Sequence, residues 1–583
     1  MFTLHGPIDE EVRETLGTYD DYTAALLARR GIVSKEAAEA FLSPSYDEHI
    51  GDPLKILNME KAARRLAKAI SEQERITVWS DYDCDGIPGG VLLHDFLQKA
   101  AANFDNYIPH RHLEGYGLNI AGIEKLAAAG TTLIVTVDSG ITDVEQVQRA
   151  NELGIDVLIT DHHLPLREDG EDSPNILPPA FAVVDPKQDG ETNEYKDFCG
   201  AGLAWKLVCA TLAIGFVGRE NITPGWEKWL LDMAGLATIA DIVPLTGENR
   251  VIAKYGLVVM RKSPRIGFVK LCSIARLNQR YLTEEDVGFM IAPRVNAASR
   301  MGNPMDAFEL FATRSEERAD VLARELERIN RSRRAMGAAI TRTAHARLEE
   351  RAQAGTLPSV IALGDPDWRP GLLGIVASSL AEEYKRPVFL WGREGGTGAK
   401  GSCRSVNGIS LVELMNATKD TFEGSGGHTA AGGFTVRDDS VFFLEERLCE
   451  ALLTLPPAST VEEVKYADSE IRTADVLKTR MKETELFAPF GMGNPKPVFL
   501  LRDITLKKVV WFGKGEEHLR ISLTRDDGFT GDPLEAICFF ARRELGDVAT
   551  TLSERSTVSV LGNLERDTFT KGQPVRLRIV SIA

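Results

Sequence analysis

In the first half of this chain, an acidic residue follows each of four short apolar runs. The runs are ITVWS, LIVTV, DVLIT and FAVV, and the residues after them are Asp81, Asp138, Asp161 and Asp185. Helical patterns separate the runs, which predicts a parallel sheet with helices on both faces. In such sheets ligands bind outside the carboxyl ends of the strands. The four acids therefore predict a charged site along one edge of an α/β sheet.

Composition and charge exclude several classes of protein. With 583 residues, 43% hydrophobic and 26% charged, the chain is expected to fold into about two to five domains. The net charge of −17 argues against nonspecific coating of nucleic acid, so any polyanion site must be local. The longest apolar stretch, Leu207–Val217, is too short to span a bilayer. No secretory signal is visible, and seven scattered cysteines without a C-x-x-C pair predict a cytoplasmic location and no cysteine-ligated zinc.

Changes in pattern divide the chain into segments. The stretch from about Asp306 to Arg351 is rich in Ala, Glu, Arg and Leu and lacks proline, which predicts a long helix. After Pro456, short alternating runs separated by Gly and Asp turns predict a small barrel or sandwich. We expect a helical lead-in (residues 1–58) followed by a first α/β domain (59–305). A connecting helix (306–352) then leads to a second α/β domain (353–456) and a β-rich domain (457–583).

The motif DYDCDG places Asp81, Asp83 and Asp85 two residues apart where the first apolar run meets a glycine turn. Three converging carboxylates repel one another unless a multivalent cation neutralises them. An EF-hand calcium loop would need a late glutamate, which residues 87–92 do not supply. A solvated turn remains the alternative for this motif alone.

Two further segments add candidate metal ligands. Asp161 precedes the pair His162 and His163, and histidine beside carboxylates suits Mn²⁺, Zn²⁺ or Fe²⁺. Asp241 stands within the apolar segment ATIADIVPL, where a buried carboxylate requires a partner. Taken singly, the histidines could cap the next segment and Asp138, before Ser-Gly, could be a helix cap. Together the segments predict a metal centre.

These motifs resemble those of the DHH phosphoesterase superfamily. The segments PRVNAASRMG (293–302) and FGMGNPKPVF (490–499) narrow the resemblance to the RecJ family of single-strand-specific exonucleases. The motifs GSCRSV and GGHTAAGG, with the order and spacing of the whole series, extend it over nearly the entire chain. The resemblance implies a DHH domain, a DHHA1-like domain and an OB-like tail that binds nucleic acid.

The resemblance also implies roles for individual residues. It assigns two metal ions, Mn²⁺ or Mg²⁺, to Asp83, Asp85, Asp138, His162 and Asp241, with Asp138 as the bridge between the ions. Asp81 is expected to be a weaker ligand or an outer group. Asp161 and His163 are expected to orient His162 and to contact the scissile phosphate. The chain departs from the family at Cys84 and at Ser299, where glycine is usual, and neither is a ligand.

A terminal-phosphate site is implied as well. The matching residues are Arg111, Arg300, Ser402, Arg404 and His428, expected in a pocket between the two α/β domains. Guanidinium groups bind a terminal phosphate with two parallel hydrogen bonds. The alternative for each arginine is a surface ion pair. In the tail, basic and aromatic residues alternate at Lys507, Lys508, Trp511, Phe512 and Lys514. This pattern predicts a surface that binds single-stranded nucleic acid. The alternative is that Trp511 and Phe512 belong to the barrel core.

The function implied is a metal-dependent exonuclease that degrades single-stranded DNA from the 5′ end to 5′-mononucleotides in recombination and repair. We expect a monomer without membrane contact, served by a single-strand-binding protein and a helicase. One alternative is a DHH-type phosphodiesterase acting on short oligoribonucleotides, cyclic dinucleotides or pyrophosphate, but such chains lack a tail after Pro456. A second is a catalytically silent scaffold, whose ligand carboxylates would be eroded.

Overall fold

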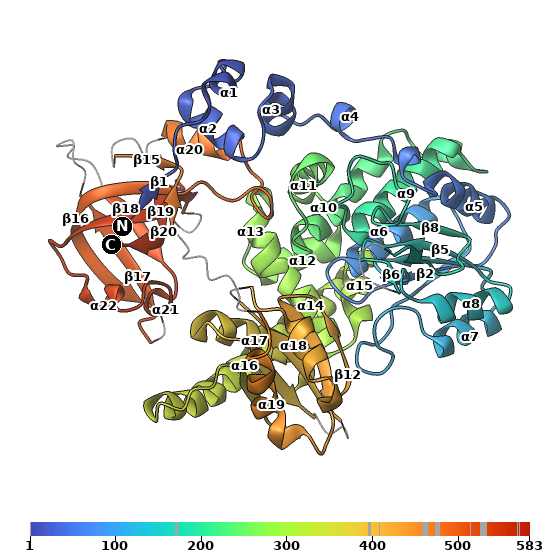
Figure 1. Ribbon diagram of the computed structural model, residues 1–583. Helices are drawn as coiled ribbons and strands as arrows, with labels where there is room; N and C mark the ends of the chain where they lie inside the picture. Colours follow the sequence, from blue (N-terminus) through green and yellow to red (C-terminus); the bar gives the residue numbers. More distant parts are fainter. Residues whose placement is uncertain are drawn as a thin grey trace. The chain divides into compact units, whose positions relative to one another are not determined.

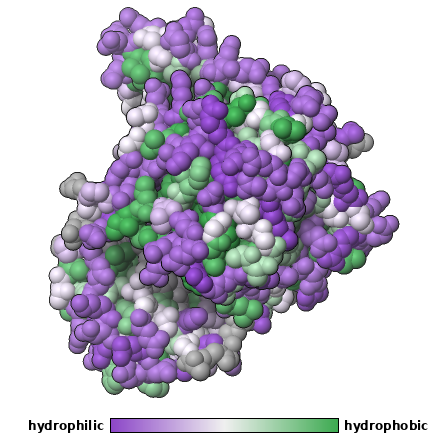
Figure 2. Space-filling view, turned by 90° about the vertical axis from the view of Figure 1, so that its right-hand side faces the viewer, coloured by the Kyte–Doolittle hydropathy of each residue, from purple (hydrophilic) through white to green (hydrophobic). Residues whose placement is uncertain are grey.

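Figure 1 shows the computed structural model of the protein. It describes residues 2–168, 173–393, 398–406, 408–456, 465–472, 478–513, 515–524, 533–567, 570 and 572–583. The chain forms two compact units: the first comprises Met1–Ser299, Asn303–Leu326 and Val464–Ala583, and the second comprises Arg300–Gly302 and Glu327–Glu463. In the face drawn in Figure 2, hydrophobic residues form small patches in a mainly hydrophilic surface. Among the described residues, no helix has both the length and the apolar character needed to cross a membrane.

The first unit contains a sheet of five parallel strands in the order β3-β2-β4-β5-β8. In chain order the strands are β2 (Ile76–Ser80), β3 (Phe104–Tyr107), β4 (Leu133–Val137), β5 (Asp156–Thr160) and β8 (Ala182–Val184). The acids Asp81, Asp138, Asp161 and Asp185 directly follow β2, β4, β5 and β8. Because parallel strands end at the same edge, the four carboxylates are brought to one side of the sheet.

Helices cover both faces of this sheet, as the sequence pattern predicted. Val78 packs in one core with α5 (Met59–Ser71), α6 (Gly86–Lys99) and α9 (Gly200–Ile214). Its neighbour Trp79 packs on the other face with α7 (Ile120–Ala128) and α8 (Val144–Glu152). Successive residues of a strand point to opposite faces, so β2 serves both cores. The predicted α/β fold class is confirmed.

The second unit has a mixed sheet in the order β12-β13-β11-β10-β9. Strands β9 (Ile361–Gly364) and β10 (Val388–Gly392) are parallel, and the other pairs are antiparallel: β11 (Ala399–Arg404), β12 (Phe422–Gly427) and β13 (Ala431–Val436). Its helices include α17 (Pro370–Tyr384), α18 (Leu411–Ala417) and α19 (Leu444–Leu452). Separate apolar cores lie around α17 and around α18 and α19.

The C-terminal strands close into a five-stranded barrel. The pairing runs β16-β17-β18-β20-β19 and returns from β19 to β16. The strands are β16 (Phe499–Phe512), β17 (His518–Leu523), β18 (Leu534–Cys538), β19 (Thr557–Arg566) and β20 (Val575–Ile582). Such closure is the architecture of the OB fold.

The N-terminal segment is more than a lead-in, because it packs on this barrel. It holds β1 (Thr3–Leu4), α1 (Glu10–Thr15), α2 (Asp21–Arg29), α3 (Lys35–Leu42) and α4 (Tyr46–His49). Leu26, Leu27 and Phe41 share the apolar core of the barrel strands. The rings of Tyr22 and Phe499 stack at 5.7 Å. The two ends of the chain therefore fold together (Figure 1).

The stretch expected as one connecting helix forms two helices instead, α15 (Pro304–Ala312) and α16 (Glu316–Gln353). The Thr313 hydroxyl accepts a hydrogen bond from the backbone N–H of Ser315, and the Ser315 hydroxyl accepts one from that of Arg318. Hydroxyl side chains that bond to nearby backbone compete with the helical pattern and favour helix ends. The break follows from these local contacts.

Candidate metal centre

The carboxyl edge of the parallel sheet gathers acids around one imidazole. The His162 Nε2 atom lies 3.1 Å from Asp138 Oδ1, 3.6 Å from Asp85 Oδ2 and 3.7 Å from Asp241 Oδ2. Asp81, Asp85, Asp138 and His162 are all buried. Three strand ends and one helix end thus deliver their side chains to a single point.

Three overlapping groups of side chains could each hold a cation. Each group offers ligand atoms within 4.8 Å of one another: Asp81, Asp83 and Asp138; Asp85, His162 and Asp241; Asp138, His162 and His163. Asp138 belongs to two of the groups, which suits a residue shared between two ions. Carboxylate oxygens with imidazole nitrogen form a donor set that Mn²⁺ accepts readily.

Helix N-termini hold two of the acids in place. Asp83 Oδ1 accepts hydrogen bonds from the backbone N–H of Asp85 at 2.7 Å and of Gly86, the first residue of α6, at 3.2 Å. The two oxygens of Asp85 accept from the backbone N–H of Gly200 at 2.6 Å and of Ala201 at 2.8 Å, at the start of α9. Helix N-termini stabilise negative charge. Each of the two carboxylates keeps at least one lone pair for a metal.

Asp241 reaches the cluster from outside the sheet. It directly follows α10 (Leu231–Ala240), and its backbone N–H donates to the carbonyl of Ala237 at 2.8 Å. The next residue, Ile242, has φ of 60°, a left-handed value that is rare for a β-branched residue. The chain therefore turns sharply after the carboxylate has been placed.

Asp161 contacts both histidines. Its Oδ1 atom accepts from the backbone N–H of His162 at 2.7 Å and lies 2.8 Å from His163 Nδ1, while Oδ2 accepts from the backbone N–H of Ile141 at 3.0 Å. Both oxygens of Asp161 are therefore engaged by neighbouring groups. The orienting role proposed for it remains a prediction.

The electrostatics of the site favour bound cations. Burial, together with Asp85 and other nearby acids, raises the pKa of Asp138 well above its usual value. Burial and Asp85 likewise raise the pKa of Asp241 to about 8. Burial, with the charge of His163, lowers the pKa of His162 to about 3 and keeps the imidazole neutral, the form that binds metal. Asp81 Oδ1 is buried without a hydrogen-bond partner among the described residues, as expected of a ligand atom.

Sequence reasoning missed two residues beside this cluster, Tyr116 and Lys187, and placed Asp185 at the sheet edge without giving it a role. The Tyr116 hydroxyl donates to the carbonyl of Asp138 at 3.0 Å and lies 3.1 Å from His163 Nδ1. Asp185 is fully buried, and burial raises its pKa to about 8. The charge of Lys187 opposes protonation of His162 and lowers the pKa of Asp241. Asp185 and Lys187 follow β8 at the same sheet edge, which was the available signal.

Most of the expected phosphate-binding residues meet in the second unit. Arg300 donates to the carbonyl of Gly371, in the first turn of α17, at 2.8 Å. A Cβ atom on Gly374 would lie 2.8 Å from an Arg404 nitrogen and 3.6 Å from Ser402 Oγ. Two guanidinium groups and a hydroxyl therefore lie near one helix N-terminus, where anions bind favourably.

The other two expected residues are placed differently. His428 is exposed in the β12–β13 turn, and its backbone N–H donates to the carbonyl of Ala431, the residue paired with Arg404. Arg111 belongs to the first unit, where its guanidinium lies over the ring of Tyr82, 4.9 Å from the centroid. The proposed role of both remains a prediction.

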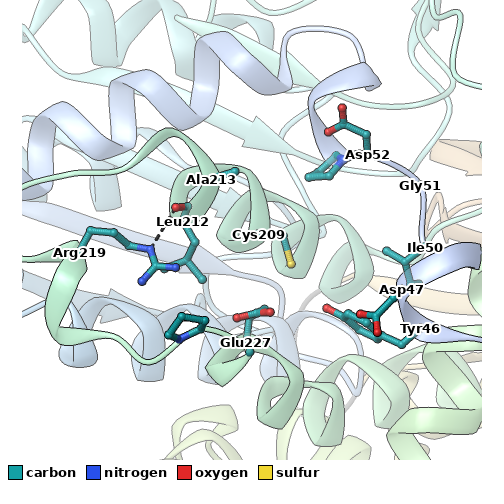
Figure 3. Close-up of a pocket in the computed structure, with 13 residues that line it drawn as sticks. Tyr46, Asp47, Ile50, Gly51, Asp52, Cys209, Leu212, Ala213, Arg219 and Glu227 are labelled. Atoms are coloured by element: carbon teal, nitrogen blue, oxygen red, sulfur yellow. Dashed lines mark hydrogen bonds between the residues drawn. The ribbon is translucent and has the colours of Figure 1, made fainter.

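A separate pocket of about 400 Å³, shown in Figure 3, lies between α4 and the end of α9. Three of its charged groups have protein partners. Asp47 pairs with Lys228 at 3.0 Å, and Asp52 accepts from the backbone N–H of Leu54 at 3.0 Å. Arg219 donates to the carbonyl of Leu212 at 3.0 Å (Figure 3).

Family models match three parts of the chain. They are the DHH family N-terminal domain over residues 75–238, the DHHA1 domain over 357–455 and the RecJ OB domain over 467–581. The first match contains most of the cluster, although Asp241 lies just beyond it. The third covers the closed barrel.

Curated relatives match most of the chain. The single-stranded-DNA-specific exonuclease RecJ of Bacillus subtilis (strain 168) is 34% identical over 562 residues, 96% of this chain and 67% of that protein. The protein of the same name from Escherichia coli (strain K12) is 30% identical over 82% of this chain and 83% of its own length. The crystal structure of RecJ with Mn²⁺ from Thermus thermophilus matches with a TM-score of 0.79 at 28% identity, covering 100% of this chain and 79% of that one. The chain belongs to the RecJ family.

Proposed function

We propose that this protein is a metal-dependent exonuclease that hydrolyses single-stranded DNA from the 5′ end to 5′-mononucleotides, in recombination and repair. The cluster of three overlapping cation-binding groups around Asp138 and His162 carries the proposal. Relatives named as single-stranded-DNA-specific exonucleases, and a matching structure that contains Mn²⁺, support it. The closed barrel has no role in the alternative, a phosphodiesterase acting on short oligoribonucleotides or cyclic dinucleotides.

The donor set fits two Mn²⁺ or Mg²⁺ ions, held by Asp83, Asp85, Asp138, His162 and Asp241, with Asp81 as an additional ligand. Bound divalent ions would supply positive charge that offsets the negative charge developing on the phosphoryl oxygens. The surrounding residues prepare the site for this. Helix N-termini orient two carboxylates, and Asp161 orients His162.

His163 is the group best suited to hold a proton near the scissile phosphate. Burial opposes its charge, but the hydrogen bond and the charge of Asp161 raise its pKa to about 9. At neutral pH the imidazole is therefore protonated, and it remains half exposed at the edge of the cluster. A cation in that position attracts a phosphate oxygen.

In this proposal, a site in the second unit binds the terminal 5′ phosphate and thereby sets the direction of digestion. Arg300, Ser402 and Arg404 lie near the first turns of α17, and His428 extends from the neighbouring hairpin. A terminal phosphate carries up to two negative charges, which two guanidinium groups and a helix N-terminus together accommodate. Anchoring the 5′ phosphate in this way would select single-stranded ends without reading any base.

The barrel is assigned to binding of the strand. The guanidinium of Arg542 lies over the ring of Trp511 at 4.7 Å, and that of Arg520 lies over the ring of Phe512 at 5.3 Å. Both aromatic rings are partly exposed, although Trp511 also contacts the barrel core. Exposed aromatic rings with arginines are suited to stacking bases and binding phosphates. Lys507 and Lys508 are exposed on β16, whereas Lys514 lies outside the described residues.

We further propose a cytoplasmic monomer that receives single strands from a single-strand-binding protein and a helicase. Seven free cysteines are consistent with a reducing compartment. The test of the main proposal is digestion of end-labelled single- and double-stranded DNA with Mn²⁺, Mg²⁺ or a chelator. We expect metal-dependent release of mononucleotides from the 5′ end of single strands alone. Release from the 3′ end, or activity in chelator, would contradict the proposal.

A further inference from the structure

The residue that follows Asp241 is held in an unfavourable backbone conformation. Asp241 is the C-cap of α10, and Ile242 comes next with φ of 60°. Helices commonly end with a residue in this left-handed conformation, but glycine or asparagine normally supplies it. Isoleucine is branched at Cβ, so its side chain crowds the backbone there. Among the residues that the structure describes, Ile242 is the one β-branched residue with a positive φ.

Contacts on both sides of Ile242 hold this conformation. On the helix side, the backbone N–H of Asp241 donates to the carbonyl of Ala237 at 2.8 Å. On the other side, the Tyr195 hydroxyl donates to the carbonyl of Thr246 at 2.9 Å. Strained residues persist where the surrounding structure fixes them, and they cluster at functional sites.

The side chain of Ile242 does not repay this strain by packing in the protein. Its neighbours Ala240 and Val243 pack against the main apolar core of the first unit, whereas Ile242 is 66% exposed. A single exposed apolar residue is ordinary on a protein surface. An exposed isoleucine at a position that suits glycine or asparagine is not ordinary, because a smaller residue would avoid the strain at no loss of burial. This combination is expected where a side chain contacts a ligand.

The metal centre determines which ligand lies beside Ile242. The Asp241 Oδ2 atom lies 3.7 Å from His162 Nε2, and consecutive Cα atoms are about 3.8 Å apart. Ile242 is therefore one residue away from a carboxylate of the cluster. A nucleotide bound at this centre presents charged phosphate oxygens and also the apolar faces of its base and of its deoxyribose ring. A branched apolar side chain is complementary to those faces and not to the phosphate.

We propose that Ile242 is a substrate-contacting residue, whose side chain packs against the apolar face of the nucleotide at the metal centre. The face is that of the base or of the deoxyribose ring. The inference rests on the proposed exonuclease function, because that function places a nucleotide there. Contact with a face reads no hydrogen-bonding edge, so it adds affinity for a strand of any sequence. Strain at Ile242 thus lowers the stability of the protein and favours substrate binding, a known trade-off at active sites.

The test combines digestion kinetics with thermal melting of the full-length protein. The substrate is 5′-phosphorylated oligothymidylate with Mn²⁺, and the variants are Ile242→Asn and Ile242→Val. Asparagine relieves the strain but removes the branched apolar group. For Ile242→Asn we expect a higher melting temperature, unchanged Mn²⁺ affinity, little change in kcat and a KM about tenfold higher. Ile242→Val keeps the branch and loses one carbon, so its KM should stay within about fourfold of the wild type.

Ala101 offers a matched control. It follows the C-cap of α6 with φ of 52° and is exposed, as Ile242 is after α10. The 14 residues of α6, about 20 Å at about 1.5 Å per residue, separate it from Asp85. Ala101→Asn should raise the melting temperature as well, while KM stays at the wild-type value.

A strand with abasic nucleotides at its 5′ end locates the contact. If Ile242→Asn raises KM for the normal strand alone, Ile242 contacts the base. If it raises KM for both strands, Ile242 contacts the deoxyribose ring. Either result supports the inference.

Three results for Ile242→Asn would overturn the inference. A wild-type KM would exclude substrate contact, and a lower melting temperature would show that the side chain packs within the protein. Weaker Mn²⁺ binding would make Ile242 a positioning group for Asp241 instead.

Failure of the proposed function is recognised separately, because the wild type would then not digest the strand with Mn²⁺. In that case, fluorescence anisotropy with a labelled phosphorothioate oligothymidylate, which resists cleavage, still tests Ile242. We expect Ile242→Asn to bind this strand about tenfold more weakly than the wild type and Ala101→Asn to bind it equally well. Absence of binding by the wild type, or equal binding by both variants, would overturn the inference.

Discussion

Asp138 combines a backbone constraint with the metal-binding role that we propose for it. Its φ is 60°, and its Oδ1 lies 3.1 Å from His162 Nε2. Asparagine tolerates this left-handed conformation as aspartate does, whereas alanine tolerates it less well. A comparison of Asp138→Ala with Asp138→Asn therefore separates the effect of charge from that of backbone strain.

We predict that both substitutions abolish hydrolysis, because a residue shared by two ligand groups is lost. In the metal-free protein, Asp138→Asn should melt at a higher temperature than the wild type, since repulsion among the buried acids is relieved. Calorimetric melting and single-strand digestion measure the two effects. Wild-type turnover in Asp138→Asn would exclude the shared-ligand assignment.

Arg300 tests the direction of digestion. We predict that Arg300→Ala lowers the rate on 5′-phosphorylated strands about 10- to 100-fold. Loss of one or two hydrogen bonds between charged groups has an effect of this size. Strands with a 5′ hydroxyl should be affected less. Arg437, an exposed arginine of the same unit, provides the control substitution Arg437→Ala. An equal loss on both substrates would assign Arg300 to folding or to general phosphate binding.

At the scale of elements, the start of α9 fits closely against the strand end that carries Asp138. A Cβ atom on Gly200 would lie 2.5 Å from the Cβ of Asp138, whereas one on Gly202 would have its nearest neighbour, the Cys199 sulfur, at 3.6 Å. We predict that Gly200→Ala weakens Mn²⁺ binding about 10- to 100-fold, as loss of a positioning contact does.

Gly202→Ala, in the same helical turn, is the matched control. It should bind Mn²⁺ normally and be more stable by about 0.4–1 kcal/mol, because alanine reduces the freedom of the unfolded chain. Isothermal titration with Mn²⁺ and thermal unfolding measure the pair. Equal metal affinity in the two variants would show that helix α9 can shift without disturbing Asp138.

The barrel gives a second prediction at this scale. Removing it would expose Leu26, Leu27 and Phe41 of the N-terminal helices, so point substitutions are the sharper test. Arg542→Glu and Arg520→Glu should weaken binding of long single strands more than of short oligonucleotides. Arg502→Glu, on an exposed position of β16, is the control. Binding assays in which both strand lengths lose affinity equally would contradict a strand-tracking role.

For the whole molecule, the buried acids predict how stability depends on pH. Burial first, and neighbouring acids second, raise the pKa of Asp185 and Asp241 to about 8, and Asp161 raises that of His163 to about 9 against the effect of burial. A group whose pKa is higher in the folded state favours folding at low pH, and that contribution is lost as pH rises through the folded value. Asp185 and Asp241 act in this direction between about pH 4 and 8, and His163 acts between about pH 6.5 and 9.

We therefore predict that the metal-free protein becomes less stable from about pH 6.5 to 9. The lowered pKa of His162 acts only at lower pH, as the imidazole charges in the unfolded chain. With Mn²⁺ the trend should reverse, because the ligands bind metal in their deprotonated forms. Thermal melting across this range, with Mn²⁺ or chelator, measures both trends. Stability that rises with pH in chelator would contradict the charges assigned to the site.

Much of the fold and part of the site could be predicted from sequence. Asp81, Asp138 and Asp161 each follow an apolar run, and parallel strands bring their carboxyl ends to one edge by the geometry of the sheet alone. Tyr116 and Lys187 were missed because they lie in loops, which lack the regular repeat that shows which way each side chain of a helix or strand points. The break before α16 was missed because the hydroxyl groups of Thr313 and Ser315 outweigh a helical composition.

The sequence by itself determined the spacing of apolar residues along each segment. That spacing defines the strands and helices, and it places the acids at one edge of the parallel sheet. Only the tertiary structure decided that α10 delivers Asp241 to that edge, that the start of α9 holds Asp85, and that α2 packs on a barrel more than 400 residues away in the chain. The local pattern of apolar residues reflects the backbone hydrogen bonding of one helix or strand and the face that this element buries. Contacts between distant segments depend on how whole surfaces fit, which no short stretch of sequence displays.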